Sequence, residues 1–306
     1  MNAKSKSFPN LISEFLLDID AGEAMRRTYE NALKQYGKRL KTIKAKQYTQ
    51  ETILNFRNFL RDNGRRATTI QLYLVVLHRF FLWMYKKKYM SEFIADGVKM
   101  PKTGDTFIKA HLSADQAKRL LENIDTSTII GKRDYAMIAL MLTTGVRTIE
   151  VARANRSDLN TLSSPVLFIQ GKGHDDKDAY VKIAPTIMDA INKYLASARM
   201  YSNHKALFIS FSRRCEGKRL TTRSISRIVK NRLIEAGFDD RLLSAHSLRH
   251  TAATMNLLNG GSLEETQQLL RHKAITTTVR YTHALKRESN NSEERIAGAI
   301  FGGENF

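Results

Sequence analysis

The chain has 306 residues, 42% of them hydrophobic and 26% charged, a composition that argues against disorder and a length that allows two domains with sizeable cores. Lys and Arg number 50 against 30 Asp and Glu, so the net charge is +20 and a polyanionic partner, nucleic acid above all, is favoured. The single cysteine, Cys215, excludes an intramolecular disulfide and a cysteine-based zinc cluster, and it fits a reducing compartment.

The first hundred residues predict a small helical domain. Apolar residues recur at three- and four-residue spacing in four segments, Leu11–Ile19, Glu23–Lys41, Thr49–Arg61 and Thr68–Lys87. Residues 1–104 contain 20 Lys and Arg against 9 Asp and Glu, a net of +11. A solvated face accounts for any one of these charges, but the surplus as a whole favours a domain that lays one face on DNA phosphates.

A domain boundary is predicted in the segment Asp96–Asp105. Gly97, Pro101 and Gly104 stand there between charged residues, and a proline and its preceding residue disfavour a continuing helix. We therefore divide the chain into an N-terminal helical DNA clamp, residues 1–103, and a second domain, residues 104–306.

The second domain predicts helices around a small β-hairpin. Expected helices are Ser113–Ile124 and Lys132–Thr143, expected strands are Val166–Gln170 and Ala179–Ile183 with the loop Gly171–Asp178 between them, and the chain from Ile187 onward is mainly helical. Ser113 with Gln116 three residues later is the pattern of a capping box. The fold class expected for the whole chain is mainly α.

Neither a targeting signal nor a membrane span is predicted. Residues 1–10 contain lysines, but no apolar stretch of the signal-peptide type follows them. The most apolar run, Leu72–Tyr85, is interrupted by His78 and Arg79 and falls short of the ~20 apolar residues that a span needs. We therefore expect a cytoplasmic protein that does not contact a membrane.

Several common enzyme classes lack their motifs in this sequence. A Walker-type phosphate loop, an HExxH zinc motif and a GxSxG nucleophile elbow are all absent. His246 and His250 are four residues apart on a predicted helix, but the cation of Arg249 beside them opposes metal binding. We expect no metal ion and no cofactor.

Four separated segments place polar residues beside apolar, glycine-containing sequence: 143–150 (TTGVRTIE), 171–173 (GKG), 246–250 (HSLRH) and 272–283 (HKAITTTVRYTH). Each is weak alone. In this order and at these spacings they closely resemble the signature of the tyrosine recombinase (phage integrase) family, in particular its short Xer-like and mobile-element members. The resemblance extends from Ser113 to the C-terminus and implies an α+β catalytic domain. By position and helix count, the N-terminal part resembles that family's helical core-binding (SAM-like) domain.

The resemblance implies six catalytic residues, which are Arg147, Lys172, His246, Arg249, His272 and Tyr281. The two arginines match the two family arginines, and the lysine falls at the lysine of the hairpin that enters the minor groove. The first histidine belongs to the His-x-x-Arg pair, which His250 follows directly. The second histidine lies nine residues before the nucleophile, which is the tyrosine of Tyr-Thr-His.

The chemistry of strand cleavage accounts for these residue types. A phosphodiester under attack becomes a more highly charged phosphorane, and the guanidinium groups of Arg147 and Arg249 can each offer two donors to its non-bridging oxygens. Tyr281, with a reference pKa of about 10, is a poor nucleophile unless its proton is removed or the phosphate is polarised, so His246 is the candidate base. Lys172 is the candidate acid for the leaving 5′-oxygen.

Two further expectations complete this mechanism. His272 is expected to hydrogen-bond the phosphate or to orient the tyrosine. The 3′-phosphotyrosyl bond keeps the energy of the broken phosphodiester, so religation needs no ATP, metal or cofactor.

The sequence also departs from the family pattern. Ile149 stands where a small serine is common, and Arg271 replaces the usual glycine before His272. The loop after Gly173 is acidic, which leaves the identity of the acid open among the loop and strand lysines Lys172, Lys177 and Lys182, although Gly-Lys-Gly favours the first.

The resemblance implies double-stranded DNA recombination sites as partners, four protomers holding two sites, and a Holliday junction intermediate. The segment Glu293–Phe301, too short to fold alone, is expected to dock on a neighbouring protomer. A type IB topoisomerase and a non-catalytic DNA-binding protein are the alternatives. The sequence leaves open the DNA site, the choice among integration, excision, inversion, transposition and chromosome-dimer resolution, and the need for a second recombinase or accessory protein.

Overall fold

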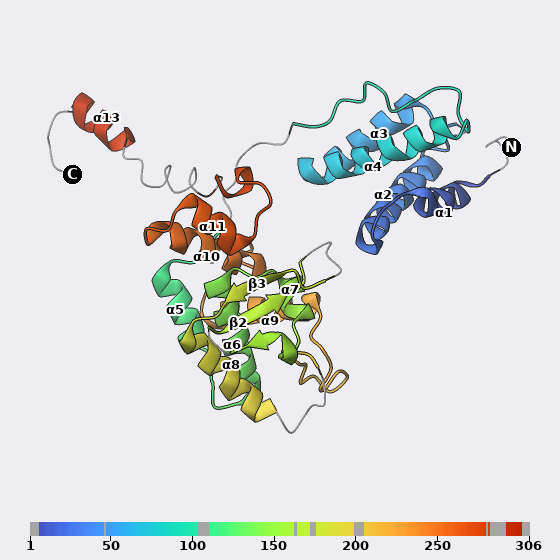
Figure 1. Cartoon of the computed structure of the whole chain (residues 1–306). Coiled ribbons are helices and arrows are strands. Elements are labelled where there is room, and N and C mark those ends of the chain that lie inside the picture. Colours follow the sequence, from blue (N-terminus) through green and yellow to red (C-terminus); the bar gives the residue numbers. More distant parts are fainter. Residues whose placement is uncertain are drawn as a thin grey trace. The chain divides into compact units, whose positions relative to one another are not determined.

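The computed structural model describes residues 6–45, 47–102, 110–161, 164–171, 176–198, 205–279, 281 and 292–301. The chain forms two compact units, Met1–Thr106 and Phe107–Phe306, so their division falls three residues after the predicted boundary. Figure 1 shows helices in both units and a small sheet in the second.

The N-terminal unit is a bundle of four helices: α1 (Phe8–Asp18), α2 (Glu23–Thr42), α3 (Gln50–Asp62) and α4 (Ala67–Lys86). Pro9 occupies the first turn of α1, where its missing N–H costs nothing. Thr49 begins α3 with a capping box that it forms with Thr52. Aromatic rings of all four helices meet in the core, Phe15, Tyr36, Phe56, Phe80 and Phe81 among them. All four predicted helices are therefore present, with ends within a few residues of those expected.

By length and composition, α4 is the one helix of the described residues that could cross a membrane. Seven of its side chains, from Ile70 to Met84, are buried in the core of the N-terminal unit. Core helices of globular domains meet the same criteria of length and composition.

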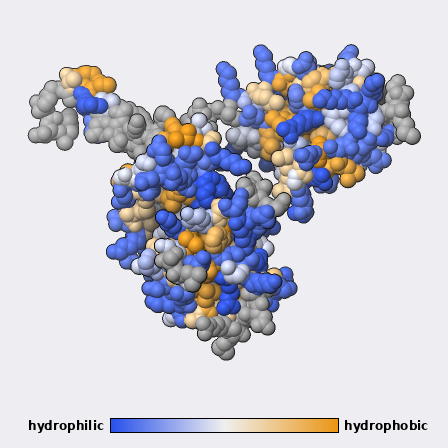
Figure 2. Space-filling view, in the orientation of Figure 1, coloured by the Kyte–Doolittle hydropathy of each residue, from blue (hydrophilic) through white to orange (hydrophobic). Residues whose placement is uncertain are grey.

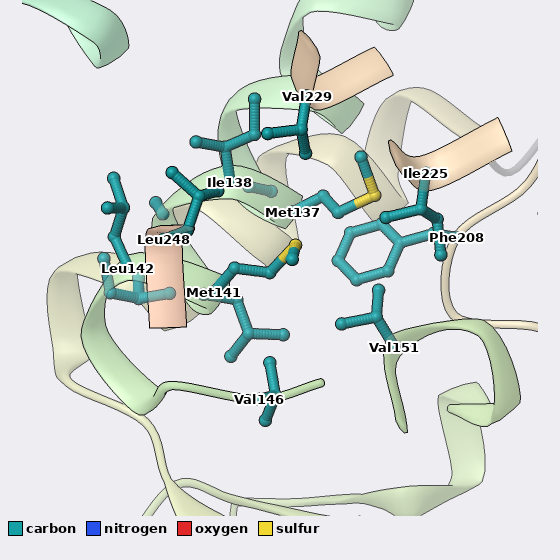
Figure 3. Close-up of a cluster of buried hydrophobic side chains, with 14 of the residues drawn as sticks. Met137, Ile138, Met141, Leu142, Val146, Val151, Phe208, Ile225, Val229 and Leu248 are labelled. Carbon is teal, nitrogen blue, oxygen red and sulfur yellow. The ribbon is translucent and has the colours of Figure 1, made fainter. Parts of the chain in front are cut away.

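The C-terminal unit is built around the buried helix α6. Its helices are α5 (Ala114–Glu122), α6 (Ile129–Thr144), α7 (Thr148–Arg153), α8 (Pro185–Ala198), α9 (Thr222–Glu235), α10 (Ala245–Leu258), α11 (Leu263–Leu270) and α13 (Ser292–Phe301), with the 3-10 turn η2 (Arg156–Asp158). Figure 3 shows side chains of α6, such as Met137 and Met141, in one cluster with Phe208, Val229 and Leu248. Helix α6 packs against α8, α9 and α10.

A three-stranded antiparallel sheet in the order β1-β2-β3 adjoins these helices. The strands are β1 (Leu159–Asn160), β2 (Val166–Ile169) and β3 (Ala179–Lys182). Strands β2 and β3 pair with Leu167 opposite Val181 and Phe168 opposite Tyr180. The first pair is buried in the core and the second is exposed, as the alternation of a strand requires. The predicted mainly α fold with a β-hairpin is confirmed, and β1 is an addition.

The surface of the C-terminal unit is mostly hydrophilic with smaller apolar patches (Figure 2). Two of the exposed apolar side chains, Ile296 and Ile300, lie on α13. Helix α13 corresponds to the predicted segment Glu293–Phe301 and begins one residue earlier.

Candidate active site

The turn from α6 to α7 brings Arg147 to the surface of the core. Gly145 ends α6 with a left-handed φ of 60°, and a Cβ there would lie 2.8 Å from a methyl carbon of Leu270. Only glycine meets both conditions without strain. Val146 directly precedes Arg147, and Val151 lies within α7. Both side chains are buried in the cluster of Figure 3. The core therefore fixes Arg147 from both sides.

Glu150 is a buried carboxylate shared by two arginines. The backbone N–H of Arg147 donates to Glu150 Oε2 at 2.7 Å, and its guanidinium Nη1 donates to Oε1 at 2.9 Å. Arg271 Nη2 donates to the same Oε2 at 3.0 Å. The Glu150 side chain is 1% exposed, so the carboxylate interacts with these arginines rather than with bulk water.

Arg249 on α10 is one of the largest fully buried side chains among the described residues. Its two terminal nitrogens donate to the backbone carbonyls of Gly145 and Leu270, which join the ends of α6 and α11. Burial, and then the charges of Arg147 and Arg271, lower the pKa of Arg249 to about 9. Three guanidinium groups thus gather around one carboxylate, an arrangement that attracts a further anion.

Tyr281 lies beside these arginines. The residue is 6% exposed, and its side chain packs with Ala253, Leu270 and Leu257. Burial raises the pKa of the Tyr281 hydroxyl, while the charges of Arg249 and Arg147 act to lower it. A phenol close to an oxyanion-binding pair of arginines can attack a phosphate that the arginines hold.

A histidine other than the predicted base contacts the tyrosine. His250 Nδ1 and the Tyr281 hydroxyl are 2.5 Å apart. The predicted base, His246, is exposed and lies one turn earlier on α10, with its ring centroid 4.4 Å from that of His250. The sequence signal for His250 was its place directly after Arg249 in the His-x-x-Arg-His segment.

His272 follows α11 and is tied to the segment that carries the tyrosine. Its Nδ1 lies 2.9 Å from the hydroxyl of Thr278, which is fully buried. His272 is therefore linked to the chain just before Tyr281. A role in orienting the tyrosine fits this contact.

Of the three candidate acids, Lys172 lies outside the described residues. The ammonium of Lys177 is paired with Asp158, a buried carboxylate that also accepts from the backbone N–H of Asn155. Lys182 is exposed at the end of β3. The Lys177 ammonium is thus engaged in an ion pair, and the identity of the acid stays a prediction.

Arg153, at the end of α7, contacts the chain just after strand β2. Its Nη1 donates to the carbonyl of Gly171 at 3.0 Å. Gly171 directly precedes Lys172 in the sequence, so α7 has Arg147 as its N-cap and contacts Gly171 through its last residue. Sequence alone gave no signal for this contact. Among the described residues, no cluster of three or more His, Cys, Asp or Glu side chains is placed to hold a metal ion.

Comparisons with known proteins identify the family to which this chain is similar. The family model described as "Phage integrase family" matches residues 110–288. "Tyrosine recombinase XerD" of Listeria monocytogenes serotype 4b (strain F2365) is 32% identical over 237 residues, which are 76% of this chain and 77% of that protein.

Solved structures give the same fold. A XerH site-specific recombinase bound to a palindromic difH substrate, in a post-cleavage complex, aligns with a TM-score of 0.75 at 21% identity, over 98% of this chain and 86% of that one. A lambda integrase tetramer bound to a Holliday junction aligns with a TM-score of 0.68 at 17% identity, over 90% of this chain and 76% of that one.

Proposed function

Because this chain belongs to the phage integrase family and is a tyrosine site-specific recombinase, we propose that it breaks and rejoins DNA strands through a bond between Tyr281 and a DNA 3′-phosphate. The observation that carries this proposal is the grouping of Tyr281 with Arg147 and Arg249, whose charges both act on the tyrosine hydroxyl. A nucleophile and two oxyanion-binding groups are the parts that a metal-independent attack on a phosphodiester requires.

Arg147 and Arg249 bind the scissile phosphate in this proposal. Each terminal nitrogen of Arg249 uses one hydrogen on a backbone carbonyl and retains a second for a non-bridging oxygen. Glu150 accepts one hydrogen bond from the backbone N–H of Arg147 and one from its guanidinium Nη1, and together these restrict the position of the guanidinium. Negative charge that develops in the phosphorane meets donors that are already in place, so little reorganisation is needed.

Cleavage then involves two proton transfers, one from the attacking Tyr281 hydroxyl and one to the leaving 5′-oxygen. The Tyr281 oxygen bonds to phosphorus while its proton passes to a histidine. His250 is a candidate for this role, because its Nδ1 lies 2.5 Å from the Tyr281 hydroxyl. His246 is the other histidine of the same helix. The bond to the 5′-oxygen breaks, and Lys172 supplies the proton that the leaving oxygen takes. Attack by the 5′-hydroxyl of a partner strand reverses these steps and rejoins the DNA, and His272 orients the tyrosine in both directions.

Arg153 positions the lysine hairpin in this mechanism. An Arg153→Ala substitution removes the donor to the Gly171 carbonyl, so the segment that carries Lys172 loses an anchor at its base. We expect the rate of strand cleavage to fall about tenfold, because small misplacements of a catalytic group cost large factors in rate. Rapid-quench measurement of cleavage on a nicked duplex checks this. A cleavage rate equal to that of the wild type would show that the hairpin is positioned without Arg153.

The wider assembly is also part of the proposal. The N-terminal unit, whose residues 1–104 carry a net charge of +11, binds DNA phosphates beside the recombination site. Four protomers hold two sites and exchange strands through a Holliday junction, as the lambda integrase tetramer bound to such a junction suggests. Ile296 and Ile300 of α13 dock on a neighbouring protomer. The protein acts in the cytoplasm on a chromosome or mobile element, alone or with a second recombinase or accessory protein.

Covalent capture tests the proposed function. Wild-type protein is incubated with nicked fragments of the source genome, so that cleavage near a nick releases a short strand and traps the adduct. After denaturation, we expect the DNA that remains attached to share one short sequence and to be joined through its 3′-phosphate. Adducts without a shared sequence would instead indicate a type IB topoisomerase. Binding without any adduct, even with a neighbouring recombinase added, would indicate a non-catalytic DNA-binding protein.

A further inference from the structure

Arg271 adopts a backbone conformation that arginine disfavours. It ends α11 with φ of 53°, in the left-handed region. A side chain with a Cβ is strained there, and glycine is not. Among the described residues, the other non-glycine positions with positive φ are Lys44 and Lys88, which are both exposed. Arg271 is instead largely buried, so its side-chain contacts offset the strain.

Those contacts join three parts of the active site. Nη1 of Arg271 donates to the carbonyl of Leu269 at 2.6 Å and approaches that of Thr144 at 3.5 Å. Nη2 donates to Glu150 Oε2 at 3.0 Å. The arginine therefore connects the end of α11, the end of α6 and the carboxylate on α7.

Glu150 has both of its oxygens engaged as a result. Oε1 accepts from the guanidinium of Arg147, and Oε2 accepts from the backbone N–H of Arg147 and from Arg271. Without Arg271, no other cation contacts Oε2 among the ion pairs of the described residues. The buried carboxylate would then be held by Arg147 alone, which is the group it has to orient.

We propose that Arg271 is a positioning residue for DNA cleavage, which holds Glu150 Oε2 and thereby fixes the carboxylate that orients Arg147 at the scissile phosphate. This inference rests on the proposed function. Arg271 brings a third guanidinium beside Arg147 and Arg249, but its terminal nitrogens are engaged with Glu150 and backbone carbonyls. It acts on the phosphate through Glu150 and Arg147.

The test is a double-mutant cycle of Arg271→Gly and Glu150→Gln. Single-turnover cleavage is measured at saturating protein on a nicked duplex that carries the sequence recovered by covalent capture. We expect each single variant to cleave roughly ten- to a hundredfold more slowly, with its affinity for the duplex changed by less than about threefold. The double variant is expected to be no slower than the slower single variant, because both changes break one connection.

Two further variants separate positioning from a general loss of structure. Arg271→Lys keeps one cation near Glu150 and is expected to recover part of the rate. The matched control is Arg232→Ala, because Arg232 shares the buried carboxylate of Asp134 with Arg133 in the same unit, away from the tyrosine. It is expected to lower the melting temperature but not the cleavage rate of the folded protein.

The outcomes distinguish this inference from the proposed function. If wild-type protein forms no adduct with the nicked genomic fragments, the proposed function fails. If wild-type protein cleaves and Arg271→Gly cleaves equally fast, the role of Arg271 is refuted. Rate losses of the two single variants that multiply in the double variant would also refute it, because Arg271 would then act independently of Glu150.

Discussion

Replacing Tyr281 with phenylalanine is expected to abolish the covalent protein–DNA adduct while leaving DNA binding within about twofold. The substitution removes the nucleophilic oxygen, and phenylalanine keeps the ring that packs with Ala253, Leu270 and Leu257. It also removes the hydrogen bond between the hydroxyl and His250, at a cost of about 1–2 kcal/mol in the free energy of unfolding. Such a loss leaves the domain folded, so a missing adduct reports on chemistry. Denaturing gel electrophoresis of protein with the captured nicked duplex measures it.

Tyr194→Phe is the matched control. Tyr194 is a buried tyrosine of the same unit, and its hydroxyl accepts from the backbone N–H of Ile209 at 3.1 Å. The control variant therefore loses a comparable hydrogen bond that involves neither Arg147 nor Arg249, and we expect it to form the adduct normally. An adduct with Tyr281→Phe at the wild-type level would show that another residue is the nucleophile.

The second large effect is expected for Arg249→Lys, which keeps the positive charge and changes its geometry. The two terminal nitrogens of Arg249 reach the carbonyls of Gly145 and Leu270 at once, and a single ammonium group cannot reproduce that fork. We expect the cleavage rate to fall by a factor on the order of 10²–10³, the usual result of removing an oxyanion donor. The free energy of unfolding falls by about 1–3 kcal/mol, because one buried carbonyl loses its donor. Single-turnover cleavage and thermal unfolding measure the two effects separately.

Arg133→Lys controls for the loss of a buried guanidinium. Arg133 is buried, pairs with Asp134 and donates to the carbonyl of Ile209. We expect this variant to lose stability to a similar degree and to cleave at the wild-type rate once folded. If Arg249→Lys and Arg133→Lys lost equal fractions of activity, Arg249 would have only a structural role.

Elements with a clear apolar period were predictable from the sequence, and those without one were not. Each N-terminal helix has an apolar face and a polar face, and all four helices were predicted. Helix α6 is three residues longer at its start than predicted, because Thr128 caps it at Gly131 and burial on nearly all sides removes the contrast between faces. Helix α7 has six residues and β1 two, which is too short for a period to be read.

Some residues of the candidate site were likewise predictable from the sequence, whereas the contacts between them were not. The order and spacing of residue types in the sequence predict Arg147, Arg249, His272 and Tyr281 as site residues. The contacts of His250 with Tyr281 and of Arg271 with Glu150 join residues 31 and 121 positions apart. Such pairings depend on how α7, α10 and α11 pack, and a single sequence does not record that. For Arg271, the one signal in the sequence is its place where the resemblance implies a glycine.

Helix α7 also limits how this sequence can change over evolutionary time. Arg147 is the N-cap of this six-residue helix, Glu150 lies in its first turn, and Arg153 is its last residue. One inserted or deleted residue would rotate everything after it by about 100° around the helix axis and separate Arg153 from Gly171. Descendants that remain active are therefore expected to keep the length of this segment. Partly exposed positions, such as Ile149, are free to change identity, which explains how isoleucine is accommodated where a serine is common.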